Sequence, residues 1–334
     1  MVDNAPGPAT SRRHLSPGLV RYVGVRVLAS VGVLLAVSLV VFAFVHAAPG
    51  GPEQSIGGEL ATPEQREAIR EEYGLNKPLP EQYLTFLSHA VRLDFGSSFA
   101  QRAPVTDVIR EAAGTTVPLL LITWVFSMVF GIVLGTIAAG RPGGRFDRFV
   151  LGATILGASA PVFATGTLLA YLFGVQLRWL PVQGAGEGGL DTLEHLILPA
   201  LTAATMLLAI TTKFSRVRIG QILEEDQMTF ARARGLRGGF VLKNVILKNA
   251  GVQLVTLSGG MLISLLSGLI IVERVFNLPG IGSLLIEGIE ARDIPLVQGV
   301  TLFIALVVVT VNLGADLVCL ALDPRLRRSL GGAR

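Results

Sequence analysis

The 334-residue chain has little charge, few aromatic residues and a single cysteine. Only 16% of its residues are charged and 7% are aromatic, whereas 51% are hydrophobic. The lone Cys319 excludes a disulfide within the chain. The sequence also lacks a Gly-x-x-x-x-Gly-Lys-Ser/Thr phosphate loop, a His-Glu-x-x-His zinc motif and a Gly-x-Ser-x-Gly nucleophile elbow. These absences exclude the usual ATP-binding loop, and we expect no catalytic residue and no bound metal in this chain.

The sequence contains six long runs without Lys, Arg, Asp or Glu. Most of the six runs exceed the roughly 20 residues that a helix needs to cross about 30 Å of hydrocarbon, and the fourth is near the lower limit. Helices are the spanning form, because an open chain in lipid would leave its backbone polar groups unpaired. Buried helices of a large soluble protein are the alternative, but such helices are shorter. The sequence therefore predicts an all-α membrane protein with six transmembrane helices.

The positive charges indicate how these helices are oriented. If the amino terminus is cytoplasmic and all six runs cross, about two thirds of the 28 lysines and arginines lie inside, while most acidic residues lie outside. This distribution predicts a multi-pass protein of the cytoplasmic membrane with both termini in the cytoplasm. The net charge of +4 then reflects topology and does not indicate a nucleic-acid partner.

The expected organisation follows from the runs and the charges. It comprises a cytoplasmic tail at 1–23, a first span at 24–48, an external helical segment at 49–113, a transmembrane core at 114–320 and a cytoplasmic tail at 321–334. Within the core we expect spans at 114–140, 149–177, 195–212, 249–272 and 294–320, an inside loop at 213–248 and an external re-entrant loop at 273–293. In the external segment, Thr62-Pro63-Glu64-Gln65 is typical of a helix start. Its acidic residues suggest a solvated helix face more than a metal site.

The inside loop 213–248 is a basic, polar stretch between two apolar runs. A helical segment carrying Phe230 and Ala231 runs into Gly235, a residue type that ends helices in a left-handed cap. The Ala-x-Ala-x-Gly core at 231–235, followed by Val245-x-Leu247, resembles the coupling loop of ABC-importer permeases. The family's acidic residue and first Ala are replaced around Thr229 and Phe230, and Lys248 stands where Pro is usual. Permeases of the dipeptide/oligopeptide branch resemble this chain in both of these departures from the general family pattern.

Further motifs resemble the same branch over about residues 20–328. They are the stretches 73–83, 93–99 and 179–184, and above all 273–282 with 292–299. The resemblance implies the six-helix fold of a type I importer permease and a permease subunit that translocates dipeptides or oligopeptides. It also implies a second homologous permease, an extracytoplasmic substrate-binding protein and cytoplasmic ATPase subunits, which would hold ATP and Mg, with no cofactor in this chain. The residues implied for ATPase coupling are Thr229, Phe230, Ala231, Arg232, Ala233, Arg234, Gly235, Leu236, Val245 and Leu247. Those implied for an external gate or receptor contact are Glu273, Phe276, Pro279, Gly280, Gly282, Arg292 and Asp293.

Several residues in the spans allow two interpretations. Pro161 is either a packing kink or part of the wall of a translocation path. A four-residue repeat in the fifth span is either a helix-packing face or a pore face; its members are Thr256, Gly260, Ser264 and Gly268. His195 has no second His or Cys nearby, so a structural or interfacial role is favoured over a metal ligand. Asp316 is a functional candidate because it lies in a span, but it is near enough to the inside end to reach water or an Arg of the tail.

Other classes of function remain open at this stage. An ion-coupled secondary transporter would need buried acid or His relays, of which only Asp316 gives a hint, and often an internal repeat. A structural scaffold would explain the helices but not the loop or the external motifs. Within the importer class, nickel, glutathione and oligosaccharide are alternative substrates.

Overall fold

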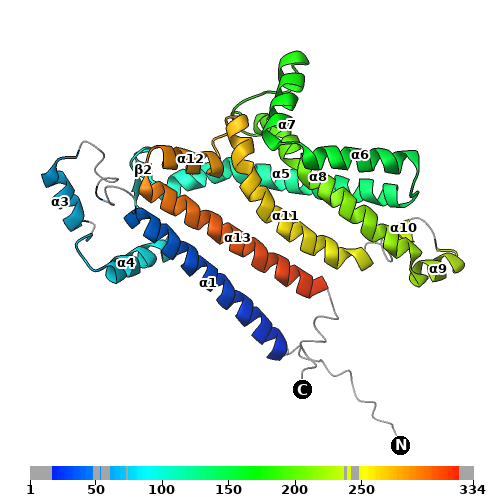
Figure 1. Cartoon of the computed structure of the whole chain (residues 1–334), viewed down its shortest axis with the longest axis horizontal. Helices are drawn as coiled ribbons and strands as arrows, with labels where there is room; N and C mark the ends of the chain where they lie inside the picture. The colour runs from blue at the N-terminus through cyan, green and yellow to red at the C-terminus, as the bar shows by residue number, and fades with distance from the viewer. Residues whose placement is uncertain are drawn as a thin grey trace, which may run out of the picture.

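The computed structural model describes residues 17–47, 53, 61–72, 74–236, 239–241 and 248–322, and this part of the chain is almost entirely helical. Figure 1 shows long helices running side by side, with short helices at both ends of them. The elements are α1 (Pro17–Ala47), α3 (Pro63–Glu72), α4 (Leu79–Val91), β1 (Ser97–Ser98), β2 (Ala103–Pro104), α5 (Val105–Ala139), α6 (Arg145–Ser159), α7 (Val162–Leu169), η1 (Ala170–Gln176), α8 (Leu190–Glu224), α9 (Asp226–Ala233), α10 (Gly239–Val241), α11 (Lys248–Val275), α12 (Ile281–Glu290) and α13 (Ile294–Leu322). The two short strands pair antiparallel just before α5.

Five helices are long and apolar enough to cross a membrane, namely α1, α5, α8, α11 and α13. The expected span at 149–177 falls instead on α6 and the α7–η1 pair, which meet at an angle of 108° and count as a sixth span only if a broken span is allowed. Pro161 explains the break. It disfavours helical backbone at the residue before it, and Ala160 has an extended ψ of 128°. Pro161 then occupies the N-cap of α7.

Small residues let α5 and α8 pack closely along their length. A Cβ atom added to Gly131 would lie 2.6 Å from the Cβ of Thr211, and one added to Gly135 would lie 2.6 Å from the Cβ of Ser215. Both distances are far shorter than real contacts between carbon atoms. Glycines spaced four apart on α5 therefore allow the two backbones to approach each other, as is common between membrane helices.

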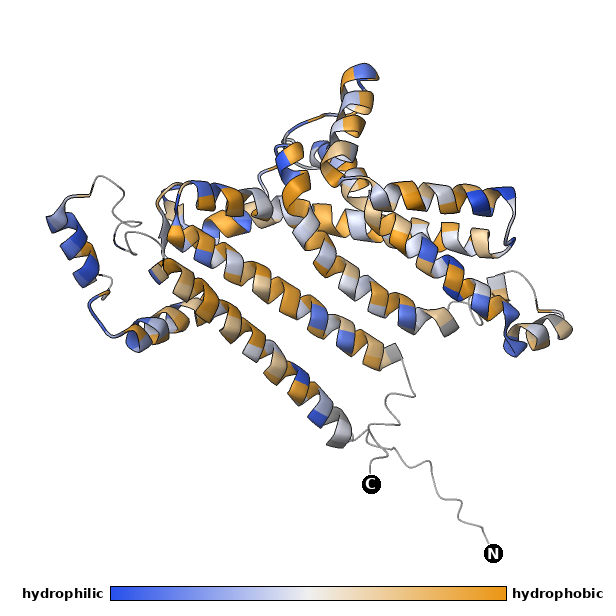
Figure 2. Cartoon of the chain, in the orientation of Figure 1, coloured by the Kyte–Doolittle hydropathy of each residue, from blue (hydrophilic) through white to orange (hydrophobic). Residues whose placement is uncertain are grey.

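The hydrophobic core divides into three clusters along these helices. The central one lies between α5, α7, α8 and α11 and includes the buried Leu119, Leu196 and Phe276. A second joins the start of α5 to α12 and the start of α13. A third joins the ends of α5 and α8 to Met228 of α9 and the start of α11. Hydrophobic residues run along the long helices in Figure 2, whereas hydrophilic residues gather on α3.

Polar contacts hold α1, the external helix α4 and α6 in place. Arg26 of α1 pairs with Asp316 of α13 at 3.1 Å, along the flank where these two helices lie together in Figure 1. At the other end of α1, the Nε2 of His46 lies 2.9 Å from the Oε1 of Gln82 in α4. The buried Asp147 carboxylate of α6 accepts hydrogen bonds from the guanidinium of Arg216 in α8. These contacts join α1 to α13, α4 to α1 and α6 to α8.

The helix start predicted at Thr62 is confirmed. The Thr62 backbone N–H donates to the Gln65 side chain at 2.9 Å, and the Gln65 N–H donates back to the Thr62 hydroxyl at 3.3 Å. This reciprocal pair is a capping box, which satisfies donors that the first turn of a helix cannot satisfy itself.

Candidate functional site

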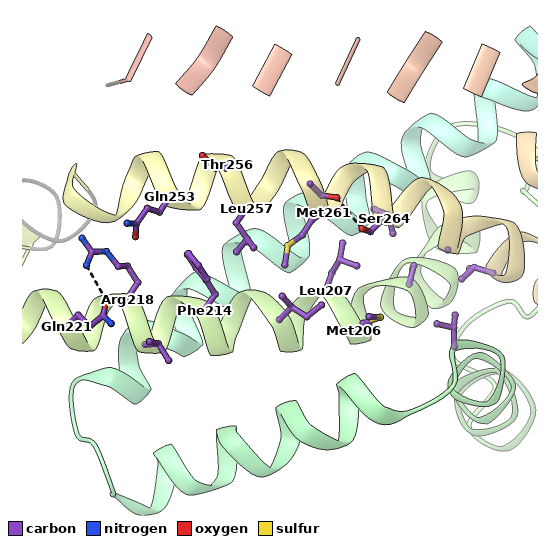
Figure 3. A pocket seen from close by; sticks show the side chains of 18 residues that line it. Met206, Leu207, Phe214, Arg218, Gln221, Gln253, Thr256, Leu257, Met261 and Ser264 are labelled. Atoms are coloured by element: carbon purple, nitrogen blue, oxygen red, sulfur yellow. Dashed lines mark hydrogen bonds between the residues drawn. The ribbon is translucent and has the colours of Figure 1, made fainter. Parts of the chain in front are cut away.

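A cavity of about 950 Å³ lies between α8 and α11, with Val162 of α7 also contributing to its wall (Figure 3). Its middle is apolar and is lined by side chains such as Leu207, Leu257 and Met261. Volumes of about 300–1,000 Å³ are typical of sites that enclose small molecules. The cavity is therefore large enough to hold a small organic solute.

The four-residue repeat of α11 faces this cavity. Thr256, Gly260, Ser264 and Gly268 all line it. A Cβ atom added to Gly260 or Gly268 would meet no described heavy atom within 4 Å, whereas one added to Gly259 would lie 2.6 Å from the Cβ of Ala315 in α13. Gly259 is thus the glycine that packs against another helix of this chain. Thr256 also contacts α13, because its hydroxyl oxygen lies 3.2 Å from the Sγ of Cys319. The repeat therefore contributes to the cavity wall and, at Thr256, to packing within the chain.

The end of the cavity nearest α9 is polar. Arg218 and Gln221 reach it from α8, and Gln253 reaches it from α11 (Figure 3). The Nη1 of Arg218 donates to the Oε1 of Gln221 at 3.2 Å and lies 3.7 Å from the Oε1 of Glu225. In the sequence, Arg218 is distinguished only as one of the basic residues of the inside loop 213–248. Helical spacing continued from Leu207 through Phe214 would have placed Arg218 on the cavity face of α8.

α9 carries the residues that the sequence assigned to ATPase coupling. Met228 and Ala231 are buried, and Met228 packs in the cluster that joins the ends of α5 and α8 to the start of α11. Their neighbours project away from the core, and the Phe230 side chain is 71% exposed. Thr229, Ala233, Arg234 and Gly235 are also exposed, Leu236 is half-buried, and Arg232 lies within the helix. A short rigid helix therefore presents one aromatic side chain to the surroundings.

Gly235 ends α9 in the left-handed conformation, as predicted. Its φ is +72°, which L-residues with a side chain adopt only at a cost. The Leu236 N–H donates to the Ala231 carbonyl at 3.1 Å, the bond between residues five apart that marks a Schellman cap. Val245 and Leu247, the other two residues assigned to coupling, lie outside the described residues.

Glu273 is fully buried at the end of α11 and organises the segment that follows it. Its Oε2 accepts hydrogen bonds from the N–H groups of Gly282 at 2.8 Å and Ser283 at 3.1 Å, in the first turn of α12. Its Oε1 accepts from the Thr116 hydroxyl at 2.6 Å. Gly280 is required here, because a Cβ atom on it would lie 2.2 Å from the Glu273 carboxylate. The carboxylate thus binds the start of α12 from a different helix.

The remaining residues of the expected external gate divide by burial. Asp293 is buried, and its carboxylate accepts from the Ser98 hydroxyl at 2.6 Å and from the Leu296 N–H at 3.1 Å, which caps α13. Glu273, Phe276, Gly280 and Gly282 are buried as well. Pro279 and Arg292 are exposed. Most of the expected gate residues therefore stabilise the segment between α11 and α13 from within. Only Pro279 and Arg292 present their side chains on its surface.

The other residues singled out in the sequence lie apart from the cavity. Pro161 is exposed at the α6–α7 break, and its neighbour Val162 lines the cavity instead. His195 has its Nδ1 2.9 Å from the Asp191 carbonyl in the same helix. Asp316 pairs with Arg26 of α1, which sequence analysis had not considered as its partner. In the described part of the chain, no three His, Cys, Asp or Glu residues are grouped so as to hold a metal ion.

A bundle of apolar helices with an open cavity between two of them and a short exposed helix at one end is typical of a polytopic membrane protein that moves solutes. Comparison with known proteins identifies the family. The chain belongs to the binding-protein-dependent transport system inner membrane components, whose profile matches residues 131–328. The profile of the N-terminal part of such membrane components matches residues 19–120.

Relatives and a solved structure agree with this assignment. The chain is 36% identical over 309 residues to the probable peptide ABC transporter permease protein y4tP of Sinorhizobium fredii, covering 92% of this chain and 99% of that protein. It is 38% identical, with the same coverage, to the glutathione transport system permease protein GsiC of Escherichia coli strain K12. The fold resembles the structure of the MetNI methionine ABC transporter in inward-facing conformations, with a TM-score of 0.53 and 14% identity over 65% of this chain and 97% of that one.

The family defines the general activity. The chain is a permease subunit of an ABC importer with a type I importer fold, and it lies in the inner membrane as a multi-pass protein. It is a membrane component and not itself an enzyme, and such permeases act together with ATPase and binding-protein partners.

Proposed function

We propose that this permease carries dipeptides or oligopeptides, delivered by a separate substrate-binding protein, across the cytoplasmic membrane. The proposal includes a second homologous permease beside this chain, and ATP with Mg held by cytoplasmic ATPase subunits. Both termini and α9 are cytoplasmic in this arrangement, while α3, α4 and α12 are external. The charge distribution supports this orientation.

One observation carries the proposal: α8 is a continuous helix that lines the cavity and ends directly at α9. Its residues from Ala203 to Gln221 contribute to the cavity wall, and α9 begins at Asp226. A displacement of α9 by an ATPase subunit is therefore transmitted to the cavity wall. ATP binding shifts the permease between inward- and outward-facing packings, and the permease contributes only the difference in their stability.

The cavity lining favours an organic solute over a metal cation. Of the described residues that line it, only Arg218 is charged, and none is His, Cys, Asp or Glu. A positive charge repels Ni²⁺, and the lining offers neither imidazole nor thiolate ligands. Peptides carry both apolar groups and a carboxylate, which suit the lining. Glutathione is a second candidate because it is itself a carboxylate-bearing tripeptide and because a relative at 38% identity is named for glutathione transport.

The test is affinity purification in mild detergent, with mass spectrometry of the co-purifying chains. The wild-type chain is expected to recover an ATPase and a second permease. Phe230→Asp places a charge on the exposed tip of α9 and is expected to lose the ATPase while keeping the second permease. Leu190→Asp, at the other end of α8 and 83% exposed, is the matched control and should retain both. Equal ATPase recovery with Phe230→Asp would overturn the coupling role of α9.

Substrate is tested separately by uptake into proteoliposomes that contain the whole complex and its receptor. Uptake of labelled dipeptide, glutathione and Ni²⁺ is compared. For each solute, the fraction of receptor that carries it is measured beforehand. ATP-dependent accumulation of Ni²⁺ without peptide or glutathione would contradict the assignment.

A further inference from the structure

Arg218 places a positive charge at one end of the cavity, with the Glu225 carboxylate 3.7 Å from its Nη1 as a loosely held counter-charge. Its side chain is 24% exposed, so it is largely held within the protein. None of the described residues that line the cavity is acidic, and the amides of Gln221 and Gln253 line the same end as Arg218. In surroundings of low dielectric constant, such a charge interacts more strongly with an anion than it would in water.

The guanidinium of Arg218 has hydrogen-bond donors to spare. A guanidinium offers five N–H donors. One is used on the Oε1 of Gln221, while the Oε1 of Glu225 lies 3.7 Å from Nη1, too far for a hydrogen bond. The Nε is buried and has no hydrogen-bond partner among the described residues. Figure 3 shows Arg218 and Gln253 facing each other from α8 and α11 at this end of the cavity.

We propose that Arg218 is a specificity-determining residue that binds a free carboxylate of the cargo, with the amides of Gln221 and Gln253 beside it. The planar fork of a guanidinium matches a carboxylate in two parallel hydrogen bonds, which an ammonium group cannot reproduce. The apolar middle of the cavity then takes the side chains of the cargo. This inference rests on the proposed function, because it names the group of a peptide that the cavity selects.

The same contact connects cargo to α9. Glu225 is the C-cap of α8 and directly precedes α9. A carboxylate of the cargo competes with the Glu225 carboxylate for the Arg218 guanidinium. Binding of cargo therefore weakens the Arg218–Glu225 pair, which lies next to the start of the exposed helix. The importer thus has a route by which an occupied cavity reaches the ATPase side.

The test compares a peptide with its C-terminal amide in ATP-driven uptake by the reconstituted complex. The receptor is the same in every sample, so any preference of its own cancels between variants. Arg218→Gln is expected to reduce uptake of the free-acid peptide about ten-fold or more, the factor that corresponds to loss of a charged hydrogen bond, and to leave the amide nearly unchanged. Arg218→Lys is expected to fall between. Lys213→Gln, an exposed basic residue on α8 away from the cavity, is the matched control and should keep the wild-type preference.

A second variant tests the competition. Glu225→Gln removes the competing carboxylate and is expected to lower the concentration of free-acid peptide needed for half-maximal uptake, with no change for the amide. If Arg218→Gln reduces both peptides equally, the residue has a structural role and the inference is overturned. It is also overturned if neither peptide is affected. If the wild-type complex transports neither peptide, the proposed function itself fails, which is a distinct outcome.

Discussion

Replacing Glu273 by Ala is expected to destabilise the protein strongly, because its carboxylate substitutes for a cap that α12 lacks. Gly280 occupies the N-cap position of α12 and has no side chain to offer. The first turn of the helix is satisfied instead by the Glu273 Oε2, which accepts from Gly282 and Ser283. The Thr116 hydroxyl completes the set, since it donates to Glu273 and accepts from the N–H of Ile281 at 2.8 Å.

The magnitude follows from the groups that the substitution leaves unpaired. Glu273→Ala orphans two buried N–H groups and removes the acceptor of one hydroxyl, and each buried orphan costs about 1–3 kcal/mol. Relief of the desolvated carboxylate offsets part of this cost, so a net loss of about 3 kcal/mol is expected. Glu273→Gln keeps one acceptor oxygen and is expected to cost about 1–2 kcal/mol. Thr116→Val removes the partner of Ile281 and is expected to cost a similar amount, whereas Thr116→Ser retains it.

The assay is thermal unfolding of the purified protein in mild detergent. A loss of about 3 kcal/mol corresponds to roughly 6–12 °C at 2–4 °C per kcal/mol. Arg274→Gln is the neighbouring control. It removes an exposed ion pair with Glu290 at 3.4 Å, which should contribute little. If Glu273→Ala unfolds at the wild-type temperature, or if Arg274→Gln costs as much, the carboxylate does not hold α12 in place.

Three further expectations follow from single residues. Gly259→Ala should lower the unfolding temperature, because its Cβ would lie 2.6 Å from a side chain of α13, whereas Gly260→Ala, which meets no described atom within 4 Å, should not. Gly235→Ala should cost about 1–2 kcal/mol at the end of α9 because of its positive φ, and it should reduce ATPase co-purification without unfolding the protein. The hydrogen bond from His89, with a second from a backbone N–H, holds the pKa of Asp94 below its usual range. The stability that Asp94 contributes is therefore present above its unfolded pKa and is lost as pH falls through the folded one; carboxyl-carbon NMR should show its pKa rising in His89→Ala.

Local signals in the sequence were sufficient to locate the five long helices and to recognise two of the helix caps. Runs of apolar residues locate α1, α5, α8, α11 and α13, because the length needed to cross hydrocarbon is fixed. Gly235 and the Thr62–Gln65 pair were recognisable because caps depend on residues within one turn. These are properties of short segments, so a single sequence contains them in full.

Features that depend on contacts between helices could not be predicted in the same way. The apolar run around Pro161 is compatible both with one straight span and with two helices that meet at 108°, so its sequence does not distinguish them. Gly259 and Gly260 are adjacent in sequence, but one turns toward α13 and the other toward the cavity. Glu273 resembled a possible exposed contact residue, and only the placement of Thr116 and α12 around it shows a buried structural acid. Each distinction needs the rotation of one helix relative to its neighbours.

The joint between α8 and α9 is rigid through packing and not through continuous backbone. Glu225 has an extended ψ of 151°, so the helix is interrupted there. Ile219 and Ile222 before the joint, and Met228 after it, are all buried in the same cluster. Arg218 lies six residues before Glu224, the last residue of α8, which is about 9 Å along the helix at 1.5 Å per residue. Because the cluster clamps both sides of the interruption, α9 cannot rotate without moving the part of α8 that carries Arg218. We therefore expect α9 and the polar end of the cavity to move together.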